Sequence, residues 1–153
     1  MSILKLKQLK NIQGNLAKQQ FITDNKDDEL FISILKFLLD DLIVSNISRK
    51  SWNKKVTTTP KIRITTVNQL LNYLTSCTGT DENLATLHTY LANFEPRSDY
   101  TQDYTDTIEV LEGIICKDYV TNVGIKMFNK EIPNNMINES GYMGERGKWK
   151  INY

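Results

Sequence analysis

The stretch IEVLEGIICKDYVTNVGIKMFNKEIP, residues 108–133, decides the fold that we expect for this chain. Apolar residues at helical spacing predict a helix in its first half. A short polar turn over residues 121–124 and a second short helix over residues 125–130 follow, and Pro133 ends that helix. Turn amides beside lysines can bind an anion. The alternative is a plain helix–helix connection, which the residues alone favour because such turns are common.

The same helical spacing recurs over most of the remaining chain. Helices are expected over residues 3–12, 16–24, 67–77 and from 81 onward, and a further helix begins at Asp27-Asp28 and includes Leu42. Thr66 and Gln69 form a capping-box pair at the start of one of them. We expect the helix that begins at Asp27-Asp28 to be central in the domain and its Leu42 to be buried in the core. Residues 45–66 break the pattern, and the alternation in residues 61–65 allows a short extended piece.

Length and composition place the chain in a broad class. Its 153 residues are 40% hydrophobic and 24% charged, as in an ordinary soluble domain that needs no metal or disulfide to fold. Cys77 and Cys116 are predicted to be buried free thiols. No apolar run approaches the ~20 residues of a membrane span, and no signal peptide is recognisable, so we expect a cytoplasmic protein. We predict an all-α fold, a single compact multi-helix domain over residues 1–138, with an irregular C-terminal tail over residues 139–153.

Charge is distributed unevenly along the chain. Residues 42–80 contain six basic side chains and no acid, whereas residues 81–112 contain eight acids and one arginine, which predicts a basic face beside an acidic one. The six basic side chains are Arg49, Lys50, Lys54, Lys55, Lys61 and Arg63. With Trp52 and several threonines among them, they fit contacts to the phosphates of a nucleic-acid backbone. The alternative is a solvated loop, and we favour binding.

The sequence offers no arrangement of residues typical of catalysis. His88 is the single histidine and lies on or beside an apolar helix stripe, so a packed or boundary position is favoured over a catalytic one. A Ser-His-Asp or Cys-His site cannot be argued with one histidine so placed. No glycine-rich phosphate loop is present. We therefore predict no catalytic residue, no metal site and no cofactor.

Four segments, taken in order, resemble the N-terminal DNA-binding domain of ATP-dependent DNA ligases, most closely those of the bacteriophage T4 type. They are MSILKLKQLKNI (1–12), KQQFITDNKDDELFISIL (18–35), VNQLLNYLTSCTGTDENLATLHTYL (67–91) and the stretch 108–133. The last is similar to that family's final signature, in which Arg-Asp-Leu precedes a glycine turn, a short helix with Asn-Lys, and a proline. The order and spacing of the segments carry the resemblance.

The resemblance implies an all-helical domain that grips duplex DNA around a nick. In such ligases the contacts are made mainly in the minor groove and with the sugar-phosphate backbone, which implies recognition of shape and charge without base reading. Carried over by position, the residues that would meet phosphates at the turn are Lys117, Thr121, Asn122, Val123, Gly124 and Lys126. Asn129 and Lys130 correspond to the Asn-Lys of the short helix.

The chain departs from the family pattern at three points. Lys117 replaces the usual arginine and so lacks its two-pronged hydrogen bonding. Asn122 replaces the usual turn glycine; asparagine is the next most tolerant residue of a left-handed conformation. The Lys-x-Asp-Gly motif, which carries the adenylated lysine of these ligases, does not occur. The resemblance therefore implies DNA binding without catalysis on this chain.

We predict sequence-independent binding of double-stranded, preferably nicked, DNA, as the DNA-binding part of an ATP-dependent DNA ligase whose catalytic domain is separate. The alternative is an interaction protein, a stand-alone phage protein derived from this domain that binds and modulates a host replication or defence protein. Its contact surface would be the acidic residues 81–112 and the tail 139–153. Both hypotheses place the chain in the cytoplasm, that of the host if it is phage-encoded, and neither involves a membrane.

Overall fold

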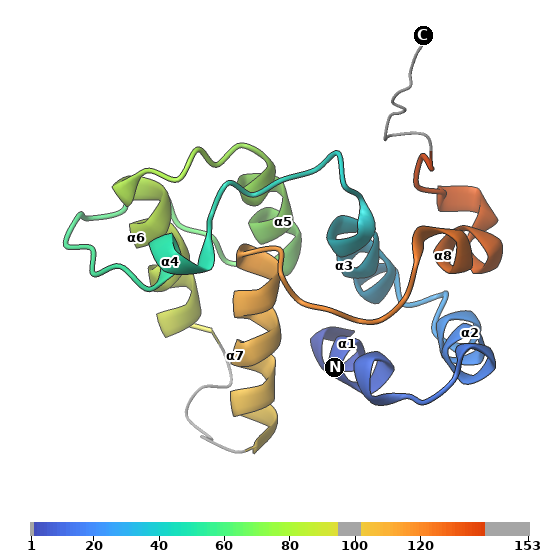
Figure 1. Cartoon of the computed structure of the whole chain (residues 1–153). Helices are drawn as coiled ribbons and strands as arrows, with labels where there is room; N and C mark the ends of the chain where they lie inside the picture. Colours follow the sequence, from blue (N-terminus) through green and yellow to red (C-terminus); the bar gives the residue numbers. More distant parts are fainter. Residues whose placement is uncertain (1, 95–101, 140–153) are drawn as a thin grey trace, which may run out of the picture. The chain divides into compact units, whose positions relative to one another are not determined.

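The computed structural model describes residues 2–94 and 102–139. In this part of the chain every regular element is a helix, so the predicted all-α class is confirmed. The helices are α1 (Ser2–Asn11), α2 (Asn15–Asp24), α3 (Glu29–Leu39), α4 (Arg49–Trp52), α5 (Val67–Thr75), α6 (Asp81–Ala92), α7 (Gln102–Ile115), α8 (Ile125–Glu131) and the 3-10 helix η2 (Pro133–Asn135) (Figure 1). Apart from Glu139, the predicted tail lies outside the described residues. None of the helices described is both long and apolar enough to cross a bilayer.

The chain divides into two compact units. Leaving aside the first three residues, unit 1 is Val44–Tyr119, and unit 2 is Leu4–Ile43 together with the chain from Val120 onward. The stretch 108–133 is therefore shared: α7 belongs to unit 1, and α8 belongs to unit 2.

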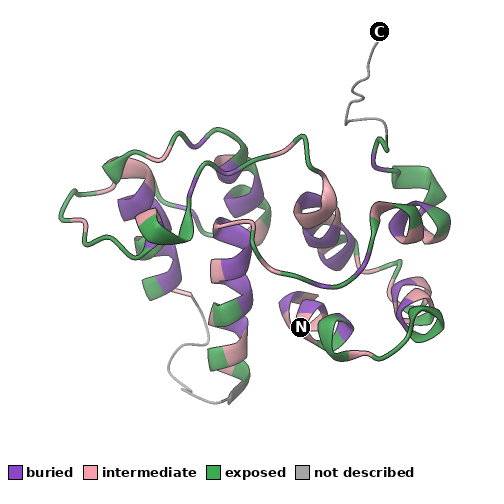
Figure 2. Ribbon diagram, viewed as in Figure 1, coloured by how far each residue is buried: buried purple, intermediate pink, exposed green. Residues whose placement is uncertain are grey.

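Unit 1 is built on α5, α6 and α7, and α6 packs against α7. Their inward faces, coloured as buried in Figure 2, form one core. Its fully buried side chains include Leu70, Leu74, Leu84, Leu87 and Leu111. Both α5 and α6 begin with a capping box, in which Thr66 pairs with Gln69 and Thr80 pairs with Asn83. The first was predicted from sequence, and each box satisfies backbone donors that a helix start leaves open.

Unit 2 is built on α3 and on the contact between α2 and α8. Phe31, Ile34 and Leu35 of α3 are fully buried, and Phe21 of α2 meets Phe31 edge to face at 5.8 Å between ring centroids. Asp28 caps α3 by accepting a bond from the Phe31 amide at 3.1 Å. Ser2 and Lys5 of α1 also donate to the Asp28 carboxylate, so one side chain links two helices.

The structure differs from the expected fold in three details. Leu42 is 63% exposed, because α3 ends at Leu39 and Leu42 lies in the turn beyond it. Residues 61–65, whose alternation allowed a short extended piece, form no strand. The short helix α4 was not predicted; Ser48 starts it by accepting a bond from the Ser51 amide.

Candidate nucleic-acid interface

The basic segment between α4 and α5 is irregular, and buried side chains fix its path. Trp52 is 1% exposed, and its indole Nε1 donates to the Glu112 carboxylate of α7 at 2.8 Å. On its other flank the Trp52 ring stacks on His88 of α6, with 3.6 Å between ring centroids and 9° between planes. Farther along, Ile64 is buried beside α6. An apolar residue near each end thus holds the basic segment against α6, although it has no regular structure.

Between this segment and α6 lie three adjoining hollows, which we call the α6 groove. Their volumes are about 230, 300 and 290 Å³. Thr89 of α6 lines all three, so they meet at this residue. The polar and charged lining residues are Lys54, Lys55, Thr58, Lys61, Arg63, Thr65, Thr86, His88, Thr89, Tyr90 and Asn93. No described lining residue is acidic, so the groove presents one sign of charge.

Some of the predicted cations are paired with acids at the border of the groove. Lys54 bonds Asp81 at 2.8 Å, and Lys61 approaches Glu82 at 3.7 Å. These pairs are exposed to solvent, where an ion pair stabilises a protein by only about 0–1 kcal/mol. The exposed side chains of Lys50, Lys55 and Arg63 have no hydrogen bond or ion pair to any described residue. The groove and the adjoining α4 therefore keep charge available for an anionic partner.

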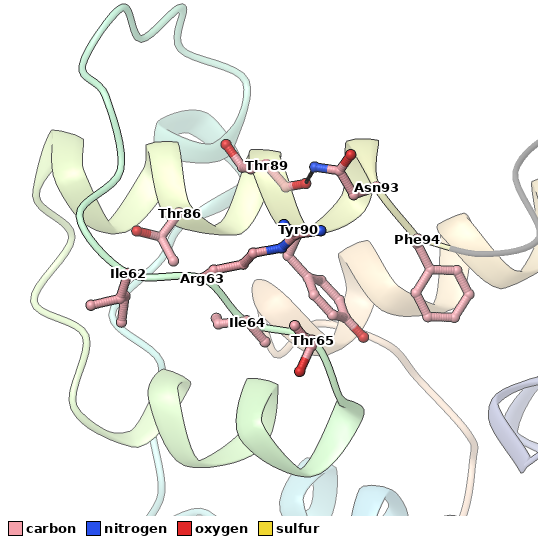
Figure 3. Close-up of a pocket in the computed structure, with 9 residues that line it drawn as sticks. All are labelled: Ile62, Arg63, Ile64, Thr65, Thr86, Thr89, Tyr90, Asn93 and Phe94. Atoms are coloured by element: carbon pink, nitrogen blue, oxygen red, sulfur yellow. Dashed lines mark hydrogen bonds between the residues drawn. The ribbon is translucent and has the colours of Figure 1, made fainter.

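Arg63 extends from the loop along α6 toward Tyr90 (Figure 3). Tyr90 and Thr86 are buried, and neither hydroxyl has a hydrogen-bond partner among the described residues. Burial raises the pKa of the Tyr90 phenol to about 12, so it stays protonated near neutral pH. The two hydroxyls point in different directions (Figure 3) and do not form a single cradle for one group.

Arg49 and the chain after α7 are brought together within unit 1. The Arg49 guanidinium makes two bonds to the Asp118 carboxylate, at 2.9 and 2.8 Å, and they raise the pKa of Arg49. Lys117, the neighbour of Asp118, has a left-handed backbone with φ of 51°. Gly113 explains how the chain folds back here: a Cβ on it would lie 2.7 Å from Cβ of Tyr119. One ion pair therefore links α4 to Asp118, the neighbour of Lys117.

The predicted turn belongs to unit 2, and its side chains differ in exposure. Thr121 and Val123 are buried, whereas Asn122 and Gly124 are exposed. Asn122 adopts the left-handed conformation, with φ of 63°. This is the position at which the family that the chain resembles has a glycine. Gly124 has φ of −94° and open space around it, so the backbone does not require glycine there.

In α8, Asn129 serves the fold. It is 5% exposed, and its amide exchanges two bonds with the Ile137 backbone, accepting from the N–H at 2.7 Å and donating to the C=O at 2.8 Å. Lys126 and Lys130 are exposed and four residues apart, hence on one face of the helix, and neither bonds to a described residue.

The structure thus brings together only some of the predicted site residues. Lys54, Lys55, Lys61 and Arg63 line one groove, while Arg49 and Lys50 lie on the adjoining α4. Sequence reasoning missed the wall supplied by α6. The signal available in the sequence was the helical spacing of three polar residues, Thr86, Thr89 and Asn93. One turn separates each from the next, so they lie on one face of α6.

Comparison of the chain with known protein families, with curated proteins and with solved structures finds no match. In the described residues no three His, Cys, Asp or Glu side chains gather as metal ligands would. Both thiols are free; Cys77 is buried and Cys116 half-buried, and burial raises the pKa of each to about 11. At neutral pH both are therefore protonated and poor nucleophiles.

Proposed function

We propose that this chain binds double-stranded DNA without reading its sequence, and prefers nicked duplex, as the DNA-binding part of a ligase of the ATP-dependent type. The observation that carries the proposal is the α6 groove, whose described lining holds four Lys or Arg side chains and no acid. Catalysis is assigned to a part outside these 153 residues. The ligase assignment itself rests on the resemblance of the four sequence segments.

The chemistry of the groove suits a phosphate backbone. Cations that replace condensed counterions supply the sequence-independent part of DNA binding. A concave surface of one sign focuses the electrostatic field, and threonine hydroxyls can donate to phosphate oxygens. From Ala85 to Asn93 the groove follows α6 for about 12 Å, at 1.5 Å per residue, which is about three base-pair steps of B-DNA.

The exposed ion pairs at the groove border are compatible with this role. Lys54 and Lys61 can exchange a carboxylate for a phosphate at little cost, because an exposed pair contributes at most about 1 kcal/mol. Arg49 and Asp118 are also partly exposed, at 45% and 44% of their side chains, but their two hydrogen bonds make this pair harder to exchange. In unit 2, Lys126 and Lys130 present a separate pair of exposed cations.

The direct test is fluorescence anisotropy with labelled nicked duplex, intact duplex and single strand at several salt concentrations. We expect the nicked duplex to bind best, and unrelated sequences to bind alike. If about six phosphates are engaged, the log–log salt slope is near −5. A flat salt response, or a clear preference for the single strand, would contradict the proposal.

Variants assign the binding to the groove and the adjoining α4. We expect the triple change Lys50→Gln, Lys55→Gln and Arg63→Gln to lower affinity for all duplexes and to reduce the salt slope by about 2 to 3. None of the three side chains bonds to a described residue, so stability should stay unchanged. The matched control is Lys26→Gln, which removes an exposed lysine outside the predicted set. Equal loss in both proteins would point to unspecific charge attraction.

A further inference from the structure

The hollow at one end of the α6 groove combines two lysines with the chain's single histidine. Lys54, Lys55 and His88 line it, together with Thr58 and Thr89, and its volume is about 300 Å³. From this geometry we infer that the hollow is a phosphate subsite in which protonated His88 is the third cation, so that anion binding strengthens as pH falls. The inference deepens the proposed function, because the phosphate would be one of the DNA backbone.

The tautomer of His88 follows from its hydrogen bond. Its Nε2 lies 3.0 Å from the Trp52 carbonyl oxygen, and a carbonyl can only accept. The proton of the neutral ring is therefore on Nε2, and Nδ1 is the nitrogen that takes up a second proton. The imidazole of a histidine changes charge between about pH 5 and pH 8, the range in which a cell operates.

Charged and aromatic groups lie on more than one side of His88. Lys54 and Lys55 line the same hollow. The Trp52 ring stacks on the imidazole, and a cation over an indole face is attracted by the ring. The Glu112 carboxylate of α7 accepts a bond from the Trp52 indole N–H. A bound phosphate would place a negative charge beside the two lysines and the imidazole.

Among the described residues, further charged groups on neighbouring elements are engaged in ion pairs. Asp81 is paired with Lys54, and Arg49 of α4 is bonded to Asp118. On α6 itself, the residues one turn before and after His88 are uncharged: Leu84, Ala85, Leu91 and Ala92. Protonation and phosphate binding are thus linked through the hollow.

Trp52 supplies the readout. The chain has two tryptophans, and Trp149→Phe leaves Trp52 as the sole reporter in contact with His88. The fluorescence of Trp52 would be followed from about pH 5 to pH 8 in three samples. They are the protein without ligand, the protein with a duplex whose ends carry hydroxyls, and the protein with inorganic sulfate. Sulfate does not titrate in this range, and hydroxyl ends remove the terminal phosphates that do.

We expect the duplex to shift the midpoint of the Trp52 transition to higher pH. Duplex affinity should be about two- to fivefold higher near pH 6 than near pH 8, as one added exposed charge pair allows. His88→Gln can still donate a hydrogen bond to the Trp52 carbonyl, and it should abolish the difference in affinity between the two pH values. The α-amino group of the chain titrates in a similar range, and a difference that persists in His88→Gln would be assigned to it. Lys55→Gln should lower affinity at both pH values and keep the difference.

Each outcome decides the matter. If the duplex binds with a pH dependence that His88→Gln leaves unchanged, or without moving the Trp52 midpoint, the subsite is overturned while DNA binding stands. If sulfate moves the midpoint and the duplex does not bind, the subsite holds for free anions and the DNA function fails. If neither moves it, the subsite is rejected.

Discussion

Unit 1 and unit 2 use the same polar residue types for opposite purposes. In unit 1, lysines of the irregular segment line a hollow surface, and Lys55 bonds to no described residue. In unit 2, Lys18 is 5% exposed, and its ammonium donates to the carbonyls of Leu9 and Ile12 at the end of α1. A cation there satisfies orphan carbonyls and complements the helix dipole. Residue type alone therefore does not distinguish a ligand contact from a structural one.

The hollows of the two units differ in the same sense. The α6 groove has cations and hydroxyls in its described lining, whereas a hollow of about 510 Å³ in unit 2 is lined by Lys26 and also by Asp27, Glu29 and Glu131. Mixed charge near a surface cancels at a distance, while charge of one sign attracts a polyanion. The comparison predicts that unit 1 supplies most of the DNA affinity. In unit 2, substitutions of polar residues should mainly change the stability of the fold.

Trp52→Ala should have the largest effect on stability. The side chain is fully buried between Glu112 and His88, and truncating such a residue costs about 3–5 kcal/mol. Urea denaturation would measure the loss. Trp52→Phe keeps a ring for His88 and loses the bond to Glu112, so it should cost less. A loss below about 1 kcal/mol for the alanine variant would mean that the basic segment is not anchored here.

Asn129→Ala should follow, because it leaves the buried N–H and C=O of Ile137 without their partner. Such unsatisfied groups cost about 1–3 kcal/mol each, and we expect a total of about 2–3 kcal/mol in urea denaturation. Lys130→Ala, the exposed neighbour, is the control and should change stability by less than about 0.5 kcal/mol. Unchanged stability with lost DNA binding would instead make Asn129 a ligand contact.

The sequence predicted much of the fold, because periodicity and caps are local signals. The capping box of Thr66 and Gln69 and the start of α3 at Asp28 were readable within four residues. The α4 helix was missed since its four residues are too few for a periodic pattern. The end of α3 was missed because Leu42 continues the apolar pattern, although the chain turns away at Asp40.

The candidate site was predictable only in part. A run of cations without acids is visible in sequence, and it marks the loop side of the α6 groove. The α6 side was hidden, because Thr89 and Asn93 are 26 or more residues beyond Arg63 and the contact depends on tertiary packing. For the same reason the pairing of Asn129 with Ile137 could not be foreseen, although Asn122 was correctly expected to tolerate a left-handed backbone.

Removing two charges from each unit compares their shares of DNA binding. We expect Lys55→Gln with Arg63→Gln to lower duplex affinity about tenfold and the salt slope by about 2, because both side chains line the groove. Lys126→Gln with Lys130→Gln should lower affinity about threefold and the slope by about 1. Anisotropy at matched salt measures both. A larger loss from the α8 pair would reverse the order of the two units.

Asp28→Ala should have the smallest effect, and it depends on pH. Partial burial acts to raise the pKa of Asp28, but bonds from Lys5, the Phe31 amide and Ser2 outweigh burial and hold the pKa below its usual value of 3.8. A carboxyl whose pKa is lowered in the folded state stabilises the fold at pH values above its unfolded pKa. It loses this contribution as pH falls through its folded pKa.

Near neutral pH the loss of the helix cap should cost about 1 kcal/mol in urea denaturation. The difference from wild type should shrink below about pH 4, whereas Asp27→Ala, an exposed neighbour, should show no such trend. A gap between Asp28→Ala and wild type that persists in acid would show that the side chain acts through packing and not through its charge.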